Sequence, residues 1–341
     1  MYLHALETAV PDAAYSQQTC WQILEQSQAA RGLKERSLGL LRKILLGQNG
    51  IDQRHFAMPD IERVFDRSAE ELNQAFEREA PALAGQALTR ALQQADLKAA
   101  DLDALFVCTC TGYLCPGVSS HLAEQLGLRP DAHLQDLVGL GCGAAIPTLR
   151  SASAFARAEP EARIAVVAVE VCSAAFYLDD DPGVLISLCL FGDGAASVIG
   201  SGTPGPDDLG RIDHFDTVHL PEDRELLRFE NRQGKLRNRL DKTVPAVAAR
   251  AVRHLFDRLP QPPETLVSHA GGRDVLDAIE AAIPGYPQAA SRAVLRSHGN
   301  MSSPSVLFGL NRHLADNPPG ADTWLTSFGA GFSAHSCRLV R

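Results

Sequence analysis

The pattern of apolar and polar positions predicts helices early in the chain and buried strands after them. Apolar residues recur at three- and four-residue spacing among charged ones from Gln17 to Lys43, from Ala69 to Phe76 and from Pro81 to Ala95. The first 100 residues are therefore expected to be mainly helical. Two short runs rich in apolar and β-branched residues, Leu105 to Thr111 and Ile164 to Val171, predict buried strands. Strands separated by helical patterns indicate a mainly parallel sheet with helices on its faces.

One segment stands out as a boundary between two parts of the chain. Ser201 to Gly210 combines Gly, Pro and Asp and has no apolar periodicity, which is typical of a loop. We therefore predict one half over residues 1–205 and a second over residues 206–341.

The second half repeats features of the first in the same order. The matched segments are Ala87–Gly112 with Ala246–Gly272, Gly141–Ala145 with Gly299–Ser303, and Phe191–Ser197 with Phe328–Ser333. Three matches in one order indicate an internal duplication with a period of about half the chain. Interfaces between such halves are frequent places for a ligand site.

Composition narrows the class of protein. Hydrophobic residues make up 45% of the 341 residues and charged ones 21%, as in ordinary globular proteins. The formal charge of −9 argues against general nucleic-acid binding. The longest apolar stretch, Ile164 to Tyr177, contains Glu170 and is shorter than the roughly 20 residues of a membrane span. With no signal-peptide pattern at the N-terminus, the eight cysteines are expected to be thiols in a reducing cytoplasm.

Cys142 is the leading candidate for a nucleophile. It lies between Gly141 and Gly143 and just before a helical pattern. The positive end of a helix dipole favours a thiolate, and the glycines permit a tight turn beside a substrate carbonyl. The alternative is a small buried cysteine that only fills space.

His269 and Asn300 are the other candidate polar groups. His269 follows a predicted strand and precedes a glycine turn, where it could act as a general base or hydrogen-bond donor. Its alternative is a histidine satisfied by the backbone. Asn300 occupies the segment that matches the Cys142 segment, and its amide could donate to an oxyanion. Its alternative is a helix N-cap.

Other motifs carry less information. Cys108, Cys110 and Cys115 include no CxxC pair and are better explained as thiols at strand positions than as metal ligands. The run Lys235 to Arg239 is predicted to be a solvated loop. No serine lies in a GxSxG elbow, so a serine hydrolase is not expected. Because there is no CxxC pair, a metal centre is not expected either.

Several motifs together resemble the type III polyketide synthases, the chalcone and stilbene synthase family of the thiolase fold. The resemblance runs from about residue 85 to the C-terminus. It rests on Gly141-Cys142-Gly143, Ser268-His-Ala-Gly-Gly272, Gly299-Asn-Met-Ser-Ser303, Ser327-Phe-Gly-Ala-Gly331, Thr111-Gly-Tyr-Leu-Cys-Pro-Gly117, Leu126-Gly-Leu-Arg-Pro130 and Leu190-Phe-Gly-Asp-Gly-Ala195. It implies an α/β thiolase-like fold in which two duplicated halves form five layers, αβαβα.

The resemblance also implies roles in an iterative decarboxylative Claisen condensation of malonyl-CoA onto an acyl-CoA starter. Cys142 would carry the acyl group, and His269 would hold its thiolate as an ion pair. His269 and Asn300 would stabilise the enolate formed when carbon dioxide leaves. Phe191 would separate the coenzyme A tunnel from the reaction cavity, and Ser302 would face that cavity. The enzyme would need no cofactor besides its coenzyme A thioester substrates.

Departures from the plant enzymes point to a different starter. Asn238 stands where they have a second gatekeeper phenylalanine, Cys110 and Cys115 stand where they have Thr and Met, and Ala330 replaces a proline of the cyclisation loop. Altered walls change what a cavity accepts. The segment around Asn238 resembles bacterial enzymes that extend fatty acyl starters to alkylpyrones or alkylresorcinols, and we expect this product class.

The resemblance predicts further partners and leaves two alternatives open. A homodimer is expected, with Arg42 and Lys43 as contacts for the coenzyme A phosphates and an acyl carrier protein as a possible source of starter. One alternative is a single-condensation enzyme similar to ketoacyl synthase III. The other is a non-catalytic acyl-binding protein of the same fold.

Overall fold

The computed structural model describes residues 1–317 and 322–340. The strands are β1 (Tyr2–Ala9), β2 (Ala14–Ser16), β3 (Gln53–His55), β4 (Ala104–Thr109), β5 (His133–Val138), β6 (Ile164–Glu170), β7 (Gly194–Ser201), β8 (Gly210–His219), β9 (Leu227–Arg232), β10 (Lys235–Leu240), β11 (Thr265–Ser268), β12 (Thr323–Gly329) and β13 (Ser333–Val340). The α-helices are α1 (Gln17–Gln26), α2 (Glu35–Leu45), α3 (Ala69–Gln94), α4 (Val118–Leu126), α5 (Ala145–Ala158), α6 (Pro182–Leu190), α7 (Val244–Phe256), α8 (Arg273–Ala282), α9 (Ala289–His298) and α10 (Ser305–Asp316).

Nine strands form one mixed sheet in the order β11-β12-β13-β8-β1-β7-β6-β4-β5. Among the strands of the described residues, only the pairs β4–β5, β4–β6 and β11–β12 are parallel, so the prediction of a mainly parallel sheet was wrong. The turn between β12 and β13 is too short for a crossover and returns the chain antiparallel. The prediction failed because a strand covered on both faces is apolar throughout, whichever way its neighbours run.

The strand order repeats about the junction of β8 and β1. The series β4-β6-β7-β1 and β11-β12-β13-β8 each contain one parallel pair followed by two antiparallel pairs. The matched segments of the sequence analysis also fall on corresponding elements. For example, Ala87–Gly112 contains the end of α3 followed by β4, and Ala246–Gly272 contains α7 followed by β11. These matches support the duplication. The division at residues 205 and 206 lies in the loop between β7 and β8 and stays a prediction.

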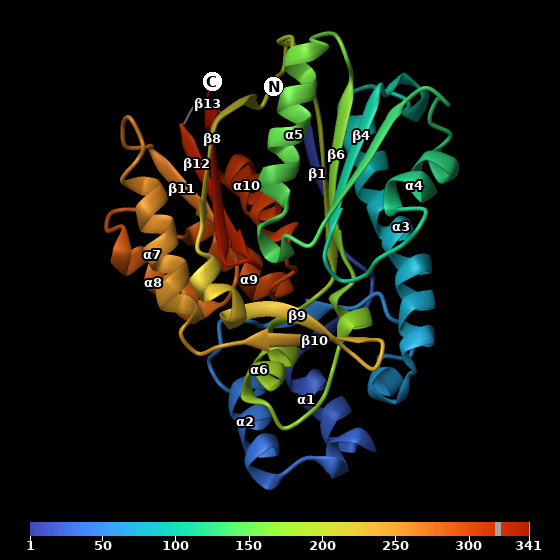
Figure 1. Cartoon of the computed structure of the whole chain (residues 1–341), viewed down its shortest axis with the longest axis vertical. Helices are drawn as coiled ribbons and strands as arrows, with labels where there is room; N and C mark the ends of the chain where they lie inside the picture. Colours follow the sequence, from blue (N-terminus) through green and yellow to red (C-terminus); the bar gives the residue numbers. More distant parts are fainter. Residues whose placement is uncertain (318–321, 341) are drawn as a thin grey trace.

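Three hydrophobic cores separate five layers, αβαβα, as the resemblance implied. One core lies between α3 and the first series of strands. A second surrounds α5 and α10 between the two series, and a third lies under α7. Figure 1 shows α5 and α10 in the middle, α3 and α4 on one side, and α7 and α8 on the other. A cap of α1, α2, α6 and the β9–β10 hairpin lies at the lower end of that view.

Local structure near the N-terminus differs in detail from the prediction. The expected helix from Gln17 to Lys43 is two helices, α1 and α2, separated by a 3₁₀ turn at Ala29–Gly32. The two helical patterns between Ala69 and Ala95 join into the single helix α3, which contains Pro81. Strand β1 was missed although it lies inside the sheet, because a register irregularity interrupts the alternation of its buried positions. The buried strands β4 and β6 confirm the other two predictions.

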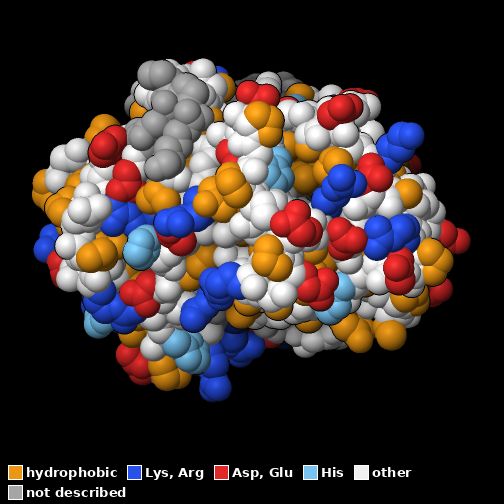
Figure 2. Space-filling view, turned by 90° about the horizontal axis from the view of Figure 1, so that it is seen from above, with side chains coloured by type: hydrophobic (Ala, Val, Ile, Leu, Met, Phe, Trp, Pro, Cys, Tyr) orange, Lys and Arg blue, Asp and Glu red, His pale blue; other side chains and the backbone are white. Residues whose placement is uncertain are grey.

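The surface fits the acidic composition. Figure 2 shows acidic and basic side chains interspersed over one face rather than a continuous basic area. Within residues 1–317 and 322–340, no helix is long and apolar enough to cross a membrane.

Candidate active site

Cys142 lies in a 3₁₀ turn, Gly141–Gly143, that leads directly into α5. The turn requires glycine at position 141, where φ is +57° and a Cβ atom would lie 2.9 Å from the backbone nitrogen of Ala330. The thiol is buried, with the residue 8% exposed. The turn thus places Cys142 in contact with the loop that follows β12, on the other half of the chain.

A pocket of about 620 Å³, a volume that includes its open mouth, contains Cys142 in its wall. Both halves contribute side chains, and Arg228 is the only charged residue in the described wall. The wall includes Cys110, Cys142, Cys172, Phe176, Ser187, Leu188, Phe191, Leu227, Arg228, Phe229, Asn238, Ser302 and Ala330. We call this space the catalytic pocket.

His269 directly follows β11 and is fixed by its backbone. Its N–H donates to the carbonyl oxygen of Thr326 at 2.8 Å, and its ring meets that of Phe328 edge-on at 5.2 Å. Neither ring nitrogen has a hydrogen-bond partner among the described residues. The reading of His269 as a histidine satisfied by backbone therefore does not hold for its side chain.

Asn300 joins the end of α6 to the segment before α10. Gly299 precedes it with a φ of +71°, and a Cβ there would lie 2.6 Å from the carbonyl oxygen of Leu190. The Asn300 amide nitrogen donates to the carbonyl oxygen of Gly271 at 3.1 Å, and its oxygen accepts from the backbone N–H of Ser302 at 2.8 Å. The N-cap of α10 is Pro304, so the N-cap reading of Asn300 was wrong.

Shared neighbours bring these three residues to one place between the halves. Ser302 and Cys142 lie in the wall of the same pocket, and the Ser302 hydroxyl lies 3.2 Å from the sulfur of Cys110. A Cβ on Gly143 would lie 3.2 Å from the backbone of Phe328, whose ring contacts His269. The side chains of His269 and Asn300 are buried beside the catalytic pocket rather than in its wall.

Burial determines the charge state of Cys142 and His269. It raises the pKa of the Cys142 thiol to about 12 and lowers the pKa of His269 to about 3. The helix N-terminus alone therefore does not produce the thiolate that the sequence analysis expected. A thiolate in this site needs a positive partner that enters the same dry space, because each charge alone is unfavourable there.

Glu170 is a buried carboxylate that the sequence analysis noted only as an interruption. It ends β6 and accepts hydrogen bonds from the Thr111 hydroxyl at 2.8 Å and the Cys110 N–H at 2.9 Å. It also accepts from the Ser303 hydroxyl at 2.5 Å, which ties the first half to the second. Burial raises the pKa of Glu170 above its usual value. A charged residue within an apolar strand was the signal that would have found it.

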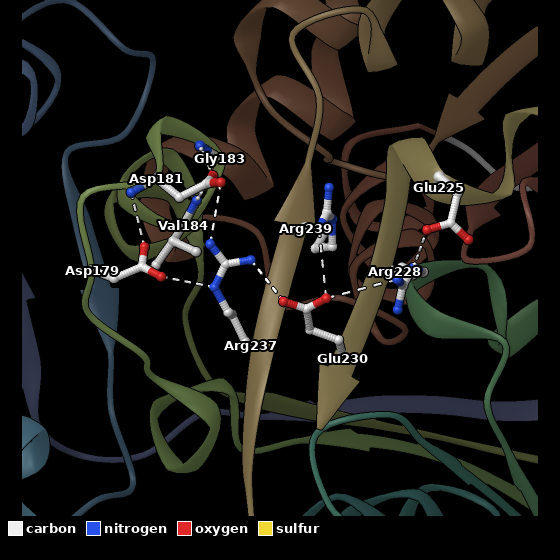
Figure 3. Close-up of polar contacts among 9 residues, drawn as sticks. All are labelled: Asp179, Asp181, Gly183, Val184, Glu225, Arg228, Glu230, Arg237 and Arg239. Atoms are coloured by element: carbon white, nitrogen blue, oxygen red, sulfur yellow. Dashed lines mark hydrogen bonds and ion pairs between the residues drawn. The ribbon is translucent and has the colours of Figure 1, made fainter. Parts of the chain in front are cut away.

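The β9–β10 hairpin forms one wall of the catalytic pocket. Lys235 to Arg239 lies in β10, paired with β9, so the prediction of a solvated loop was wrong. Arg237 is 6% exposed and donates to Asp179 and Glu230, both at 2.8 Å, while Asp181 lies at 3.2 Å (Figure 3). These carboxylates hold the pKa of the Arg237 guanidinium above its usual value despite its burial. The pattern of alternating charges could not show which side chains turn inward.

The next position on β10 faces the catalytic pocket. Asn238 is buried, and its amide donates to the Ser187 hydroxyl of α6 at 2.8 Å. Asp181 accepts from the N–H groups of Gly183 and Val184 and so caps the same helix. The hairpin and α6 are therefore joined at two places, by Arg237 with Asp181 (Figure 3) and by Asn238 with Ser187.

Only some of the remaining predicted site residues lie in the described wall of the catalytic pocket. Phe191, Ser302, Cys110 and Asn238 lie in the wall of the catalytic pocket. Cys115 is exposed in the loop between β4 and α4 and is absent from that wall. Arg42 and Lys43 are exposed in the last turn of α2, and their predicted contact with coenzyme A stays a prediction.

Comparison with known proteins decides the family. Residues 8–261 match the model of the FAE1/type III polyketide synthase-like proteins. The chain is 30% identical over 302 residues to 1,3,6,8-tetrahydroxynaphthalene synthase of Streptomyces coelicolor, covering 85% of this chain and 80% of that protein. The chain belongs to the type III polyketide synthase family.

One further relative and one solved structure agree. A 3,5-dihydroxyphenylacetyl-CoA synthase of Streptomyces toyocaensis is 29% identical, over 95% of this chain and 86% of its own length. The crystal structure of the Streptomyces coelicolor tetrahydroxynaphthalene synthase superposes with a TM-score of 0.88 at 26% identity, covering 100% of this chain and 99% of that one. The thiolase-like fold and the resemblance predicted from the motifs are thus confirmed.

This polyketide synthase is an acyltransferase that carries out iterative condensations of malonyl-CoA. Its substrates are coenzyme A thioesters, and enzymes of this family use no separate cofactor. Within the described residues, no group of three His, Cys, Asp or Glu side chains is arranged to hold a metal ion. All eight cysteines lie in the described part of the chain and are free thiols.

Arg237→Met is expected to destabilise the synthase by about 2 kcal/mol, because it leaves three carboxylates without their common partner. The figure is below that of a fully buried ion pair, since the carboxylates are partly exposed to water. Urea unfolding measures it. Arg239→Met is the matched control on the same strand, since Arg239 is 45% exposed and lies 3.6 Å from Glu230. Equal losses in the two variants would show that the Arg237 cluster adds nothing.

His335 is expected to make the synthase less stable as the pH falls. Burial lowers its folded-state pKa to about 4 from the ordinary 6.5. The stabilisation is therefore complete above pH 6.5 and is lost as the pH falls toward 4. Between these pH values, the free energy of unfolding should fall less steeply with pH in His335→Gln than in the wild type. The difference in slope should reach about 1.4 kcal/mol per pH unit. Measurement at pH 8 isolates the packing change, and parallel curves for the two proteins would contradict the prediction.

Proposed function

We propose that the synthase extends a fatty acyl starter and releases alkylpyrones or alkylresorcinols. The observation that carries this proposal is the largely apolar wall of the catalytic pocket, to which Phe176, Leu188, Leu227 and Phe229 contribute. Apolar walls favour an alkyl chain, since its transfer from water is favourable in proportion to the area buried.

Cys142, placed at the pocket wall, is the group that accepts the starter. Its proton passes to His269, and the sulfur attacks the thioester carbonyl of the acyl-CoA. The carbon–sulfur bond to coenzyme A breaks, and the coenzyme leaves as a thiol by taking that proton back from His269. The resulting imidazolium and thiolate would stabilise each other where neither is stable alone.

His269 and Asn300 serve the malonyl unit. When its carboxyl group leaves as carbon dioxide, the electron pair of that bond moves onto the thioester and forms an enolate. Preorganised donors at the enolate oxygen are typically worth about 3 kcal/mol each. The enolate carbon attacks the acyl group on Cys142 and releases the sulfur, so the chain grows by two carbons.

A second candidate is an enzyme that builds small hydroxylated aromatic products from malonyl-CoA alone. It is favoured by two relatives, a 1,3,6,8-tetrahydroxynaphthalene synthase and a 3,5-dihydroxyphenylacetyl-CoA synthase. The polar pair of Asn238 and Ser187 in the pocket wall suits a hydroxylated intermediate better than an alkyl chain.

Product analysis with malonyl-CoA, alone and with acyl-CoA starters of increasing length, separates the candidates. Alkylpyrones or alkylresorcinols that grow with the starter would support the fatty acyl proposal. Only starter-independent aromatic products would support the second candidate. A single extension to a linear β-keto product would contradict both and favour a ketoacyl synthase III-like reaction.

A homodimer in the cytoplasm remains part of the proposal. Tyr113, Leu134 and Val138 are exposed apolar residues, and the last two belong to β5, the edge strand of the sheet. Exposed edges with apolar side chains are candidates for pairing with another chain. Light scattering coupled to gel filtration tests the dimer. Loading from a carrier protein remains a proposal that acyl-carrier-protein thioesters would test in the same assay.

A further inference from the structure

A second histidine, His335, lies beside the turn that carries Cys142. It belongs to β13, is 5% exposed, and is paired in the sheet with Ser327 of β12 and Thr217 of β8. A Cβ atom on Gly143 would lie 3.1 Å from the ring carbon Cδ2 of His335. The imidazole therefore packs against the Cys142 turn, although it is outside the described wall of the catalytic pocket. It has no part in the chemistry described above.

The hydrogen bonds of the neutral imidazole have one direction that satisfies every partner. The Ser333 hydroxyl donates to the carbonyl oxygen of Ala330 at 3.0 Å, so it has no second proton for the ring. Ser333 therefore accepts from the Nε2–H of His335, 3.1 Å away. With the proton on Nε2, the nitrogen Nδ1 is an acceptor for the Thr217 hydroxyl at 3.1 Å. The three bonds form one chain that runs from Thr217 through His335 and Ser333 to Ala330.

Burial keeps His335 in the neutral form that this chain needs. It lowers the pKa of the ring to about 4, and the positive charges of Arg150 on α5 and of His219 on β8, when protonated, act in the same direction. A neutral ring has one donor and one acceptor, whereas an imidazolium has two donors and cannot accept from Thr217. Hydrogen bonds in a buried chain also strengthen one another.

The chain ends on a residue whose backbone touches the Cys142 turn. Ala330 lies in the wall of the catalytic pocket, and a Cβ on Gly141 would lie 2.9 Å from its backbone nitrogen. A Cβ on Gly329, the residue before it, would lie 2.6 Å from the backbone nitrogen of Gly143. The two backbones are thus in contact on both sides of Cys142. Because close-packed groups transmit displacements, a shift of Ala330 moves the turn that carries the thiol.

We propose that His335 is a positioning residue for acyl transfer to Cys142. Its hydrogen bonds fix the carbonyl group of Ala330 and so hold the Cys142 sulfur where it can attack the thioester carbonyl. Misplacement of an attacking atom by 1 Å can slow a reaction by about a hundredfold, so small shifts of the turn matter. The proposal rests on Cys142 as the acyl acceptor and is independent of which starter is used.

Two amide variants of His335 separate positioning from packing. The glutamine amide nitrogen reaches the place of Nε2 and can donate to Ser333, whereas that of asparagine reaches only the place of Nδ1. We expect the maximal rate of Cys142 acylation to fall about ten- to a hundredfold in His335→Asn and to stay within about threefold in His335→Gln. The donor concentration at half-maximal rate should be unchanged in both. Equal rates in the two amide variants would overturn the proposal.

The rates are measured by intact-protein mass with hexanoyl-CoA and malonyl-CoA as acyl donors. Carbon dioxide release from malonyl-CoA is measured beside them and should be unchanged in His335→Asn, because His269 and Asn300 remain. A parallel loss of decarboxylation would mean that His335 only stabilises the fold and would overturn the proposal. Failure of both donors to acylate Cys142 in the wild type would instead contradict the acyl-acceptor role of Cys142, and the positioning proposal with it.

Ser333→Ala breaks the same chain at its next bond. It should slow acylation about as much as His335→Asn, and the double variant should be little slower than either, because all three lack one chain. Ser336→Ala is the matched control on β13, since Ser336 is also buried and its hydroxyl has no partner among the described residues. It should be acylated at the wild-type rate. An equal loss in Ser336→Ala, or fully additive losses in the double variant, would overturn the proposal.

Discussion

Cys142→Ala is expected to abolish acylation and to lower polyketide formation by on the order of a thousandfold or more. The variant lacks the only sulfur at the turn before α5, so no covalent acyl intermediate can form. Decarboxylation of malonyl-CoA should persist, since His269 and Asn300 remain to stabilise the enolate. Intact-protein mass after incubation with acyl-CoA, together with carbon dioxide release, measures the two steps separately.

The control for this variant is Cys337→Ala, which makes the same change at a buried thiol of β13 away from the pocket. It should keep the acyl adduct and the products. An adduct that survives in Cys142→Ala and disappears when Cys110 or Cys172 is replaced would assign the nucleophile to another thiol of the pocket wall.

Asn300→Ala is expected to lose decarboxylation and keep acylation, the reverse of Cys142→Ala. Removing one donor to the enolate oxygen should lower malonyl decarboxylation and condensation by about a hundred- to a thousandfold, while Cys142 still takes up the starter. The variant also loses the hydrogen bonds to Gly271 and Ser302, which costs about 1–3 kcal/mol of stability.

Asn300→Asp separates chemistry from packing. Its side chain keeps an acceptor for the Ser302 N–H but has no hydrogen-bond donor when ionised. It should therefore lose decarboxylation without losing the turn at Gly299–Ser302. Slower acylation in both variants, in proportion to their slower decarboxylation, would mean that Asn300 acts only by holding the fold of the site.

The candidate site was only partly predictable from sequence. Cys142, His269 and Asn300 each lie beside glycines in short contiguous motifs, so their spacing alone drew attention to them. Glu170 and Arg237 were missed because their importance depends on partners far along the chain. Glu170 reaches Ser303 across 133 residues, and Arg237 reaches Asp179 across 58. Local patterns carry no record of such partners.

The electrostatics of the site also needed the tertiary structure. From sequence, the helix after Cys142 predicts a thiolate, because the helix dipole is a local property. In the fold, burial outweighs that dipole and raises the pKa of the thiol to about 12. The same burial leaves both ring nitrogens of His269 without a partner among the described residues. Whether a proton can pass between Cys142 and His269 therefore depends on the burial of both groups, and a short sequence motif does not encode that burial.

By itself, the sequence determined the family, the duplication and the buried strands β4 and β6, because periodicity and compact glycine motifs are local. The tertiary structure alone decided that the sheet is mixed, that β1 lies inside it, and that Lys235–Leu240 is a strand with Asn238 in the pocket wall rather than a loop. Strand direction, burial and cavity shape arise from contacts between distant segments, and those contacts exist only once the two halves have packed together.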